Sequence, residues 1–293
     1  MNRKHSDEEA LECYNLNRAG LSFAEIARAK GYTKDVVGGM VWQVRKKLPP
    51  EFSNTLSQPL TLTGDQIVVG DVHVPCTDYG FASLVKTVAT KLQIKSLVIA
   101  GDFFNMDVFS EHPALEEKVP WAKERDAGRV LLREWVETFD TITILMGNHD
   151  RRLQKFTEGA VGPGDIFGML IANPKITVSN YSWCVVRSGG QEWRITHPKN
   201  YASSQLIVAA DLALKYQQNI ISFHEHHIGK GWDKFGRYVI CNGGTLVDPE
   251  SLAYVQLEDN RMAGMMRGFV ALRNGSAEVI GTAPFTDWTK YLN

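Results

Sequence analysis

An α/β domain preceded by a small all-α module is the fold class that the sequence predicts, and a change of pattern near Gln66 predicts it. After this residue, short apolar runs typical of buried strands alternate with amphipathic helical stretches. Before it, apolar residues recur at helical spacing, and a stretch rich in Ser, Thr and Pro follows them. We therefore expect a helical module over residues 1–50, a linker over 51–65 and an α/β domain over 66–293.

The composition narrows the class of protein. The 293 residues carry a formal net charge of −1, with 44% hydrophobic and 22% charged residues, which is ordinary for a globular protein. The balanced charge excludes a uniformly basic protein that wraps nucleic acid, so any nucleic-acid contact would come from a local basic patch. The four cysteines are far apart and form no C-x-x-C pair, which argues against a structural zinc site or a disulfide-rich secreted domain.

The sequence also predicts the compartment. The first residues are polar and acidic, without the apolar segment of a signal peptide. No apolar run approaches the roughly 18 residues that cross a bilayer. We expect a cytoplasmic protein that does not contact a membrane.

Three helices are expected in the N-terminal module. They cover residues 7–16, 23–30 and 34–48. Ala10, Leu11, Tyr14 and Leu16 are the buried candidates on the first. Ser22 and Glu25 have the spacing of a capping box at the start of the second helix, and Gly31 would end it. Two short helices joined by a tight turn that contains glycine form a helix-turn-helix pattern.

The stretch from Leu21 to Leu48 resembles the helix-turn-helix modules of transcription regulators. Gly38 and Gly39 are a departure, because each glycine inside a helix costs roughly 1 kcal/mol relative to alanine. The resemblance implies DNA as a partner. The basic residues that would contact it are Lys34, Arg45, Lys46 and Lys47. A helical bundle used for packing or oligomerisation is the alternative.

The elements of the α/β domain follow from the same periodicity. Strands are expected over 67–69, 96–100, 142–146, 176–178, 183–187, 192–196, 220–223 and 238–241, and helices over 81–92, 122–139 and 203–216. Asn274-Gly275, between two apolar runs, predicts a hairpin turn. The connection from Asp107 to Arg129 is longer than a minimal one, so we expect a lid or a substrate-selecting segment there.

Polar residues of the kinds that bind metal ions follow the strands. They are Asp71, His73, Asp102, Asn148, His149, His197, His224 and His226. Each alone has an ordinary structural explanation, such as a turn or a hydrogen-bonded histidine. Parallel strands bring their carboxyl ends together, however, so the joint occurrence at successive strand ends predicts a metal site.

These motifs resemble the calcineurin-like metallophosphoesterase superfamily. They are Asp71-Val72-His73, Gly101-Asp102-Phe103-Phe104-Asn105, Gly147-Asn148-His149-Asp150, the single His197, and Phe223-His224-Glu225-His226. The last motif departs from the family pattern, which has glycine where this chain has Phe223. His227 adds a neighbouring imidazole, so the assignment of His224 and His226 as the two ligands of this motif is less specific. The resemblance implies an α/β/β/α sandwich.

The resemblance also implies two divalent metal ions. Asp71, His73 and His226 would hold the first, Asn148, His197 and His224 the second, and Asp102 would bridge both. Mixed carboxylate, imidazole and amide donors favour Mn²⁺, with Fe and Zn²⁺ as alternatives. A hydroxide between two such ions would attack phosphorus in line.

Two further site residues are implied next to the ligands. His149 would protonate the leaving oxygen or stabilise the transition state, with Asn105 as the residue that orients it. Phosphoprotein phosphatases have aspartate at that position followed by Arg-Gly, whereas Met106-Asp107 follows here, which favours the phosphodiesterases and nucleases. Arg151 and Arg152 directly follow the Gly147–Asp150 motif, and one of them, Arg151 by preference, is a candidate for the substrate phosphate, with a solvated helix start as the alternative.

Three hypotheses about function follow. The first is a dimetal phosphodiesterase that hydrolyses nucleic acid, to which the helix-turn-helix delivers it. The second is a phosphatase or nucleotide phosphodiesterase acting on a small or protein substrate, with the N-terminal module used for assembly. The third is a non-catalytic DNA-binding regulator, which the intact set of ligands and His149 disfavours.

Overall fold

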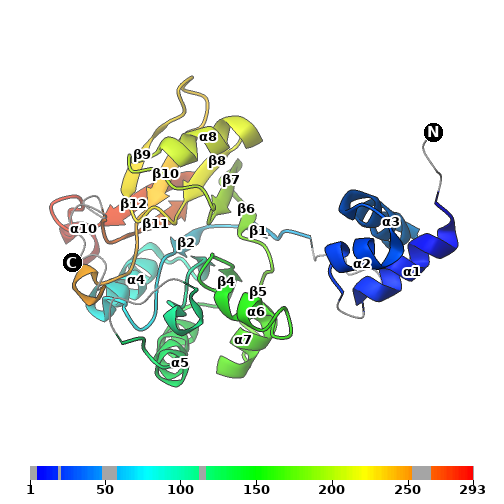
Figure 1. The fold of residues 1–293 in the computed structure, drawn as a ribbon. Helices are drawn as coiled ribbons and strands as arrows, with labels where there is room; N and C mark the ends of the chain where they lie inside the picture. Colours follow the sequence, from blue (N-terminus) through cyan, green and yellow to red (C-terminus); the bar gives the residue numbers. More distant parts are fainter. Residues whose placement is uncertain (1–4, 19–20, 48–57, 112–116, 253–264, 293) are drawn as a thin grey trace. The chain divides into compact units, whose positions relative to one another are not determined.

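The computed structural model describes residues 5–18, 21–47, 58–111, 117–252 and 265–292 (Figure 1). The chain divides into two compact units, Met1–Gln58 and Pro59–Asn293. The second unit therefore begins earlier than the expected domain, and each unit is described by itself.

The N-terminal unit contains three helices. They are α1 (Asp7–Arg18), α2 (Phe23–Lys30) and α3 (Lys34–Lys47). The Ser22 side chain accepts from the Glu25 N–H, and the Glu25 carboxylate accepts from the Ser22 N–H, so the predicted capping box is present. Gly31 ends α2 in the left-handed region, with φ 71°.

The core of this unit comes from one face of each helix. Buried residues include Tyr14 of α1, Ile26 of α2 and Val41 of α3. Leu11 was expected to be buried, but it is 45% exposed, and Cys13 is buried instead. The helical spacing is compatible with burial of either Leu11 or Cys13. The packing of α1 against α3 buries the helix face that carries Cys13.

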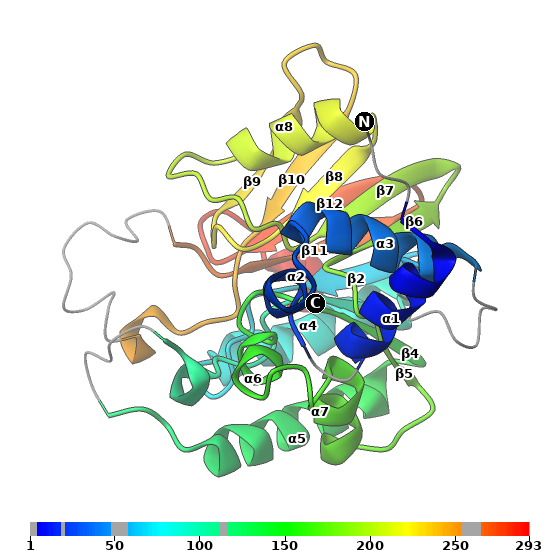
Figure 2. The ribbon, with the colours of Figure 1, turned by 45° about the vertical axis from the view of Figure 1, so that its right-hand side comes forward.

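The larger unit is a four-layer sandwich, as Figures 1 and 2 show. Within the described part, it has two six-stranded sheets. The first has the order β12 (Ser276–Gly281), β11 (Gly268–Arg273), β2 (Gln66–Val69), β3 (Ser96–Ala100), β4 (Thr141–Leu145), β5 (Ile176–Val178). The second has the order β1 (Thr61–Thr63), β6 (Trp183–Ser188), β7 (Gln191–Thr196), β8 (Asn219–Ser222), β10 (Val239–Gly243), β9 (Ile228–Trp232).

Helices cover the outer face of each sheet. On the first sheet these are α4 (Tyr79–Leu92), α5 (Trp121–Thr138) and α7 (Pro163–Leu170), and on the second it is α8 (Ile207–Tyr216). The short helices are α6 (Arg152–Phe156) and α10 (Thr289–Leu292), with 3₁₀ turns at Asp107–Phe109 and Pro249–Ser251. This arrangement confirms the expected α/β/β/α sandwich.

The alternation of side chains along the strands produces the layers. In β2, Ile67 and Val69 join the core under the helices, whereas Val68 joins the core between the sheets. Leu97 and Val98 of β3 divide in the same way. Successive side chains of a strand point to opposite faces, so a strand covered on both faces is apolar throughout.

Parallel pairing places the polar loops at the same edge of each sheet. In the first sheet, Val69 pairs with Ile99, and Ile99 pairs with Ile144, so β2, β3 and β4 end side by side. In the second, Thr196 at the end of β7 pairs with Ser222 at the end of β8. The loops that follow these strands therefore lie together.

Several elements differ from the expectation. Thr61–Thr63, assigned to the linker, forms the edge strand β1, which pairs with β6. Strand β9 and helices α6 and α7 were not expected, and α8 begins at Ile207 rather than at Ser203. The hairpin at Asn274-Gly275 is confirmed, with positive φ at both residues. Among the described residues, no helix has the length and apolar character needed to cross a bilayer.

Candidate metal centre

The first expected group of ligands lies together where the strands end. Asp71 follows β2, His73 lies two residues on, and His226 follows β8. The Oδ1 atom of Asp71 is 3.1 Å from Nε2 of His226 and 3.7 Å from Nε2 of His73. Three side chains from two different sheets thus converge on one point.

The second group lies beside the first. Asp102, His197 and His224 form it, and Asn148 Oδ1 lies 3.1 Å from Nε2 of His197. The Oδ2 atom of Asp102 is 3.2 Å from Nε2 of His197 and 3.9 Å from Nε2 of His73. Asp102 therefore lies between the two groups, where a ligand that bridges two ions belongs.

The backbone at this edge is strained. Asp71, His73, Asp102, His224 and His226 all have positive φ, between 48° and 85°. Such a conformation is uncommon for residues other than glycine and persists where surrounding contacts hold it. The Oδ2 atom of Asp71 accepts from the N–H of His224 at 2.7 Å, and Oδ1 of Asp102 accepts from the N–H of His149 at 2.8 Å. These bonds hold the loops in their unusual shape.

The glycines of the motifs make room for the ligands. A Cβ atom on Gly147 would lie 1.9 Å from Oδ1 of Asp102, and one on Gly101 would lie 2.7 Å from the ring of His197. Both contacts are too short for any side chain. The Gly-Asp and Gly-Asn pairs that the sequence presents therefore follow from close packing around the centre.

Phe223, the departure from the family motif, is accommodated by two other glycines. Its buried ring lies over Gly70 and Gly243, where an added Cβ would come within 2.5 Å and 2.3 Å of ring atoms. The chain after β8 therefore brings His224 to the centre although a large residue precedes it. His227 stays outside the ligand groups among the described residues, so the register places His224 and His226 at the centre.

The imidazole tautomers fit metal ions. Nδ1 of His73 lies 3.2 Å from Oδ1 of Asn105, and Nδ1 of His197 lies 3.0 Å from the carbonyl oxygen of Ala100. Each oxygen accepts a hydrogen bond from the Nδ1–H, so Nε2 is the ring atom that faces the centre and would bind a cation in place of a proton. Nε2 of His73 is buried and has no hydrogen-bond partner in the described chain. The donor set therefore suits divalent ions such as Mn²⁺, Fe or Zn²⁺.

The electrostatics also favour cations. Burial alone would raise the pKa of Asp71 and Asp102, yet neighbouring histidines, His226 and His197 foremost, hold the pKa of both carboxyls well below its usual range. Burial opposes protonation of His197, but the two carboxylates raise its pKa to about 9. The centre holds two buried anions that positive charge must balance.

His149 lies against the centre, but its contacts differ from the expectation. Its Nδ1 donates to the main-chain carbonyl of Asn105 at 2.7 Å, whereas the Asn105 side chain contacts His73. Asn105 thus orients His149 through its backbone and a predicted ligand through its amide. The sequence could not separate these roles, since they depend on the loop conformation.

The other ring nitrogen of His149 faces a cation. Nε2 lies 3.1 Å from Nη2 of Arg152. Burial first, and then His73 and Arg152, hold the pKa of His149 well below its usual range. His149 is near enough to His73 and Asp102 to join a ligand group. The guanidinium beside its Nε2 opposes a second cation there.

Arg152, not Arg151, borders the centre. The Arg151 guanidinium donates to the carbonyl of Asn180, away from the ligands. Arg152 donates to the Asn105 carbonyl at 2.8 Å and pairs with Asp107. The sequence offers both arginines directly after the Gly147–Asp150 motif, but it cannot distinguish them, because the direction of each side chain depends on the loop conformation.

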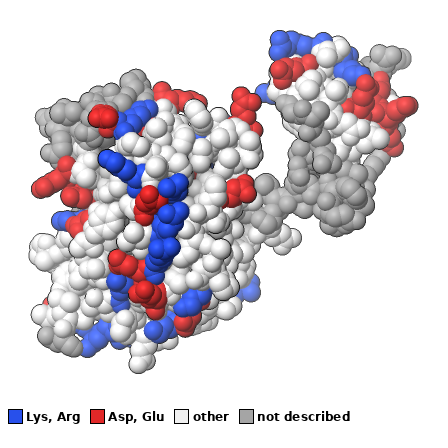
Figure 3. Space-filling model, turned by 90° about the horizontal axis from the view of Figure 1, so that it is seen from below, with Lys and Arg blue, Asp and Glu red and all other residues white. Residues whose placement is uncertain are grey.

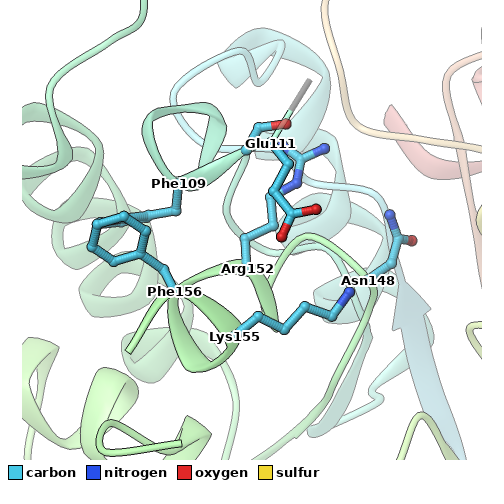
Figure 4. Close-up of a pocket in the computed structure, with 7 residues that line it drawn as sticks. Phe109, Glu111, Asn148, Arg152, Lys155 and Phe156 are labelled. Carbon is cyan, nitrogen blue, oxygen red and sulfur yellow. The ribbon is translucent and has the colours of Figure 1, made fainter. Parts of the chain in front are cut away.

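A cavity of about 180 Å³ opens beside the second ligand group (Figure 4). Asn148, Arg152, Lys155, Phe109, Phe156, Ser110 and Glu111 line it. Its Asn148 is also a predicted ligand, so the cavity adjoins the centre. Part of the expected lid segment, with His112 and Pro113, lies outside the described residues.

The expected DNA contacts fall partly outside the described residues. Lys34 is exposed at the start of α3. The side chains of Arg45, Lys46 and Lys47 are not among those that the structure describes. Their role in binding stays a prediction.

The chain matches one family profile and is similar to several solved structures. The profile of the calcineurin-like phosphoesterase family matches residues 66–268. Vps29 of Chaetomium thermophilum is similar in structure, with 13% identity, TM-score 0.38, and coverage of 75% of this chain and 94% of that one. Zinc-bound Vps29 of Entamoeba histolytica has 12% identity, TM-score 0.35, and coverage of 74% and 98%. A conserved Streptococcus pneumoniae protein described as a predicted phosphoesterase has 12% identity, TM-score 0.33, and coverage of 75% and 98%.

No curated protein matches the sequence. The centre at the strand ends defines a candidate metallohydrolase. The chain belongs to the calcineurin-like phosphoesterase family, whose profile matches more than half of it. Members of this family typically bind two divalent metal ions, and the two groups of ligands described above are the candidates here.

Asp102→Asn should abolish phosphoester hydrolysis and lower the bound metal content, because a neutral amide cannot balance the charge of two divalent ions. Metal analysis after dialysis against Mn²⁺, together with a hydrolysis assay, checks both. Asp140→Asn, which changes an exposed carboxylate far along the sheet from the centre, is the control and should retain both. Full activity with two ions bound in Asp102→Asn would contradict the bridging role.

Glu124 positions one loop of the centre. It is 1% exposed on α5, and it accepts the N–H of Met106 in the loop that follows Asn105. Burial raises the pKa of Glu124 to about 8 from a usual value of 4.5. Because the folded chain favours the protonated form, this carboxyl stabilises the fold most below pH 4.5, and the contribution is lost as the pH rises toward 8.

Glu124→Gln, which is neutral at every pH, should therefore gain stability relative to the native chain between pH 5 and pH 8. We expect roughly 2–4 kcal/mol at the upper end. Urea unfolding at both pH values measures the difference. Glu134→Gln, on the exposed side of the same helix, should follow the native chain, and a pH-independent difference for Glu124→Gln would disprove the buried acid.

Proposed function

We propose that the chain is a dimetal phosphodiesterase that hydrolyses nucleic acid. The observation that carries the proposal is the position of Asn148. This residue belongs to the second ligand group and also to the wall of a cavity lined by two basic side chains, Arg152 and Lys155. A phosphate that enters the cavity would lie against the candidate metal ligands.

In this proposal, different residues bind the phosphate and transfer the proton. Two divalent ions, Mn²⁺ by preference, would neutralise phosphoryl oxygens and lower the pKa of water. Arg152 and Lys155 would hold the phosphate by charge-assisted hydrogen bonds. His149 donates from Nδ1 to the Asn105 carbonyl, and its Nε2 faces Arg152 without a proton of its own. Once Arg152 turns to the substrate phosphate, Nε2 would take up a proton from solvent and pass it to the leaving oxygen, or the ring would stabilise the transition state.

The charges around the cavity favour a diester over a monoester. Asp107 already pairs with Arg152, and Glu111 adds a second carboxylate. Arg152 and Lys155 are thus matched by two carboxylates, so these groups give the cavity no net positive charge that would favour the second charge of a monoester. A diester carries one negative charge near neutral pH, whereas a monoester carries nearly two, so these carboxylates repel the monoester more strongly.

The N-terminal unit supports nucleic acid as the substrate class. It has the pair of helices and the glycine turn of a helix-turn-helix, with Lys34 exposed at the start of α3. On the face drawn in Figure 3, basic and acidic side chains are interspersed. That face has no broad basic surface. With a net charge of −1, we expect a contact with DNA to be local and to involve the end of α3.

His149→Ala should keep both metal ions and lose turnover by roughly 10²–10⁴-fold, as expected for the loss of a general acid. The loss should be smaller for a nitrophenyl diester, whose leaving group needs no proton. Metal analysis and kcat on two substrates, with good and poor leaving groups, measure both effects.

His224→Ala is the matched comparison, because it removes another half-buried imidazole of the same centre. It should lose metal, whereas His149→Ala should not. Loss of metal from His149→Ala would make His149 a ligand and would overturn its assignment to proton transfer.

Replacing Arg45, Lys46 and Lys47 together by alanine should weaken DNA binding and flatten its salt dependence. Lysine and arginine contacts to phosphates release counterions, so the slope should fall by about one unit for each lost contact. Anisotropy titrations at several salt concentrations measure the slope. Hydrolysis of a small nitrophenyl diester should not change, because the substituted residues lie in the other unit.

The alternative role of the N-terminal unit predicts another result. A module for packing or oligomerisation would leave DNA affinity unchanged in the triple variant and would alter the mass in sedimentation. Salt-insensitive or undetectable DNA binding by the intact chain would favour that alternative.

A further inference from the structure

An aromatic pair, the exposed Phe156 and the partly buried Phe109, forms one wall of the cavity beside the centre. Phe156, at the end of α6, is 68% exposed, and its ring centroid lies 5.4 Å from that of Phe109, with an interplanar angle of 51°. Figure 4 shows the two rings side by side, with Arg152 and Lys155 next to them. Exposed apolar side chains are common, but Phe156 differs in lining a cavity together with Arg152 and Lys155, next to the candidate centre.

The pair rests on a column of rings that reaches the core. Phe109 contacts Trp121, with centroids 5.9 Å apart, and Trp121 contacts the fully buried Phe104 at 5.0 Å. Each contact is edge-on, a favoured geometry for aromatic rings. The exposed ring of Phe156 is therefore linked to the buried core through ring contacts.

Helix α6 places the aromatic and basic groups on neighbouring positions. Arg152 and Phe156 are four residues apart, and Lys155 adjoins Phe156. Residues four apart on a helix share a face. In Figure 4, the Lys155 side chain extends toward Asn148, which is the predicted ligand on the cavity wall. One end of the cavity thus offers flat apolar surface, and the other offers positive charge next to the centre.

We propose that Phe156 and Phe109 form a stacking platform for an unpaired nucleobase, and that the substrate is a single-stranded nucleic acid. The proposal rests on the phosphodiesterase function proposed above. Phe156 stacks on the base, and Lys155 and Arg152 contact the adjoining phosphate, which lies toward Asn148. Grooves that bind single strands combine stacked aromatic rings with basic residues in this way.

The platform discriminates against duplexes for a physical reason. In a duplex, each base is covered on both faces by its neighbours and is paired at its edge, so it must be unstacked before it can lie on Phe156. An unpaired strand pays no such cost. Stacking is also tolerant of sequence, because every base has a flat face, so we expect little base preference.

The test compares two oligomers with the same phosphodiester backbone, oligo(dT) and an oligomer of abasic spacers, in the presence of Mn²⁺. The native chain should cleave oligo(dT) with the higher kcat/KM. Phe156→Ala should lower kcat/KM on oligo(dT) by roughly 10- to 100-fold and leave the abasic oligomer unchanged. Phe156→Tyr should retain the native value, because it keeps the ring.

Met169→Ala is the matched control, since it truncates an exposed apolar side chain on α7, outside the cavity lining. It should behave as the native chain on both oligomers. A duplex of oligo(dT) with oligo(dA) should be cleaved more slowly than the single strand by the native chain. Phe156→Ala should reduce that preference.

The outcomes separate the platform from the phosphodiesterase function. Hydrolysis of both oligomers at equal rates, or an equal loss on both in Phe156→Ala, would overturn the platform and leave the phosphodiesterase function standing. Hydrolysis of neither oligomer would overturn the nucleic-acid phosphodiesterase. Cleavage of the nitrophenyl ester of thymidine 5′-phosphate, but not of oligo(dT), would replace the single strand with a free nucleotide.

Discussion

Two buried carboxylates, Asp71 and Asp102, determine how the loops of both sheets are arranged around the centre. Asp71 and Asp102 are buried, and a buried charge is costly unless opposite charge and hydrogen bonds compensate it. The compensation comes from both sheets: main-chain N–H groups of the loops donate to the carboxylates, and histidines that follow β7 and β8 surround them. The candidate centre therefore links loops of both sheets, in addition to the apolar core that packs between them.

Close packing follows from that junction. Loops that converge on one point leave no room for side chains on Gly101 and Gly147, and they force several ligands into the left-handed region. Phe223 shows that the total side-chain volume near the centre is limited, whereas the position that carries the glycine can vary. The ring of Phe223 occupies space that Gly70 and Gly243 leave open, so the bulk added after β8 is balanced by a missing side chain on the neighbouring β10 and by another just after β2 of the facing sheet.

Features that depend on apolar periodicity, and residues placed at strand ends, could be predicted from the sequence. The apolar runs fixed β2, β3 and β4, and the polar residues after them came together because parallel strands end at one edge. The sequence could not predict contacts that depend on loop conformation. Asn105 uses its carbonyl for His149 and its amide for His73, and Arg152 rather than Arg151 turns toward the centre. Short elements such as α6 have too few residues for a periodic signal.

The stretch from Gly147 to Phe156 joins the candidate centre to the proposed stacking platform. Its anchor is the buried Asp150, whose carboxylate accepts the N–H groups of Gly147 at 2.9 Å and of Phe103 and Phe104 at 3.0 and 3.2 Å. These bonds join the loop after β4 to the loop after β3, and helix α6 begins directly beyond. The inner end of the stretch is therefore fixed by the centre, where few substitutions fit. Its outer end, at Phe156, faces solvent and can change with the substrate without disturbing the ligands.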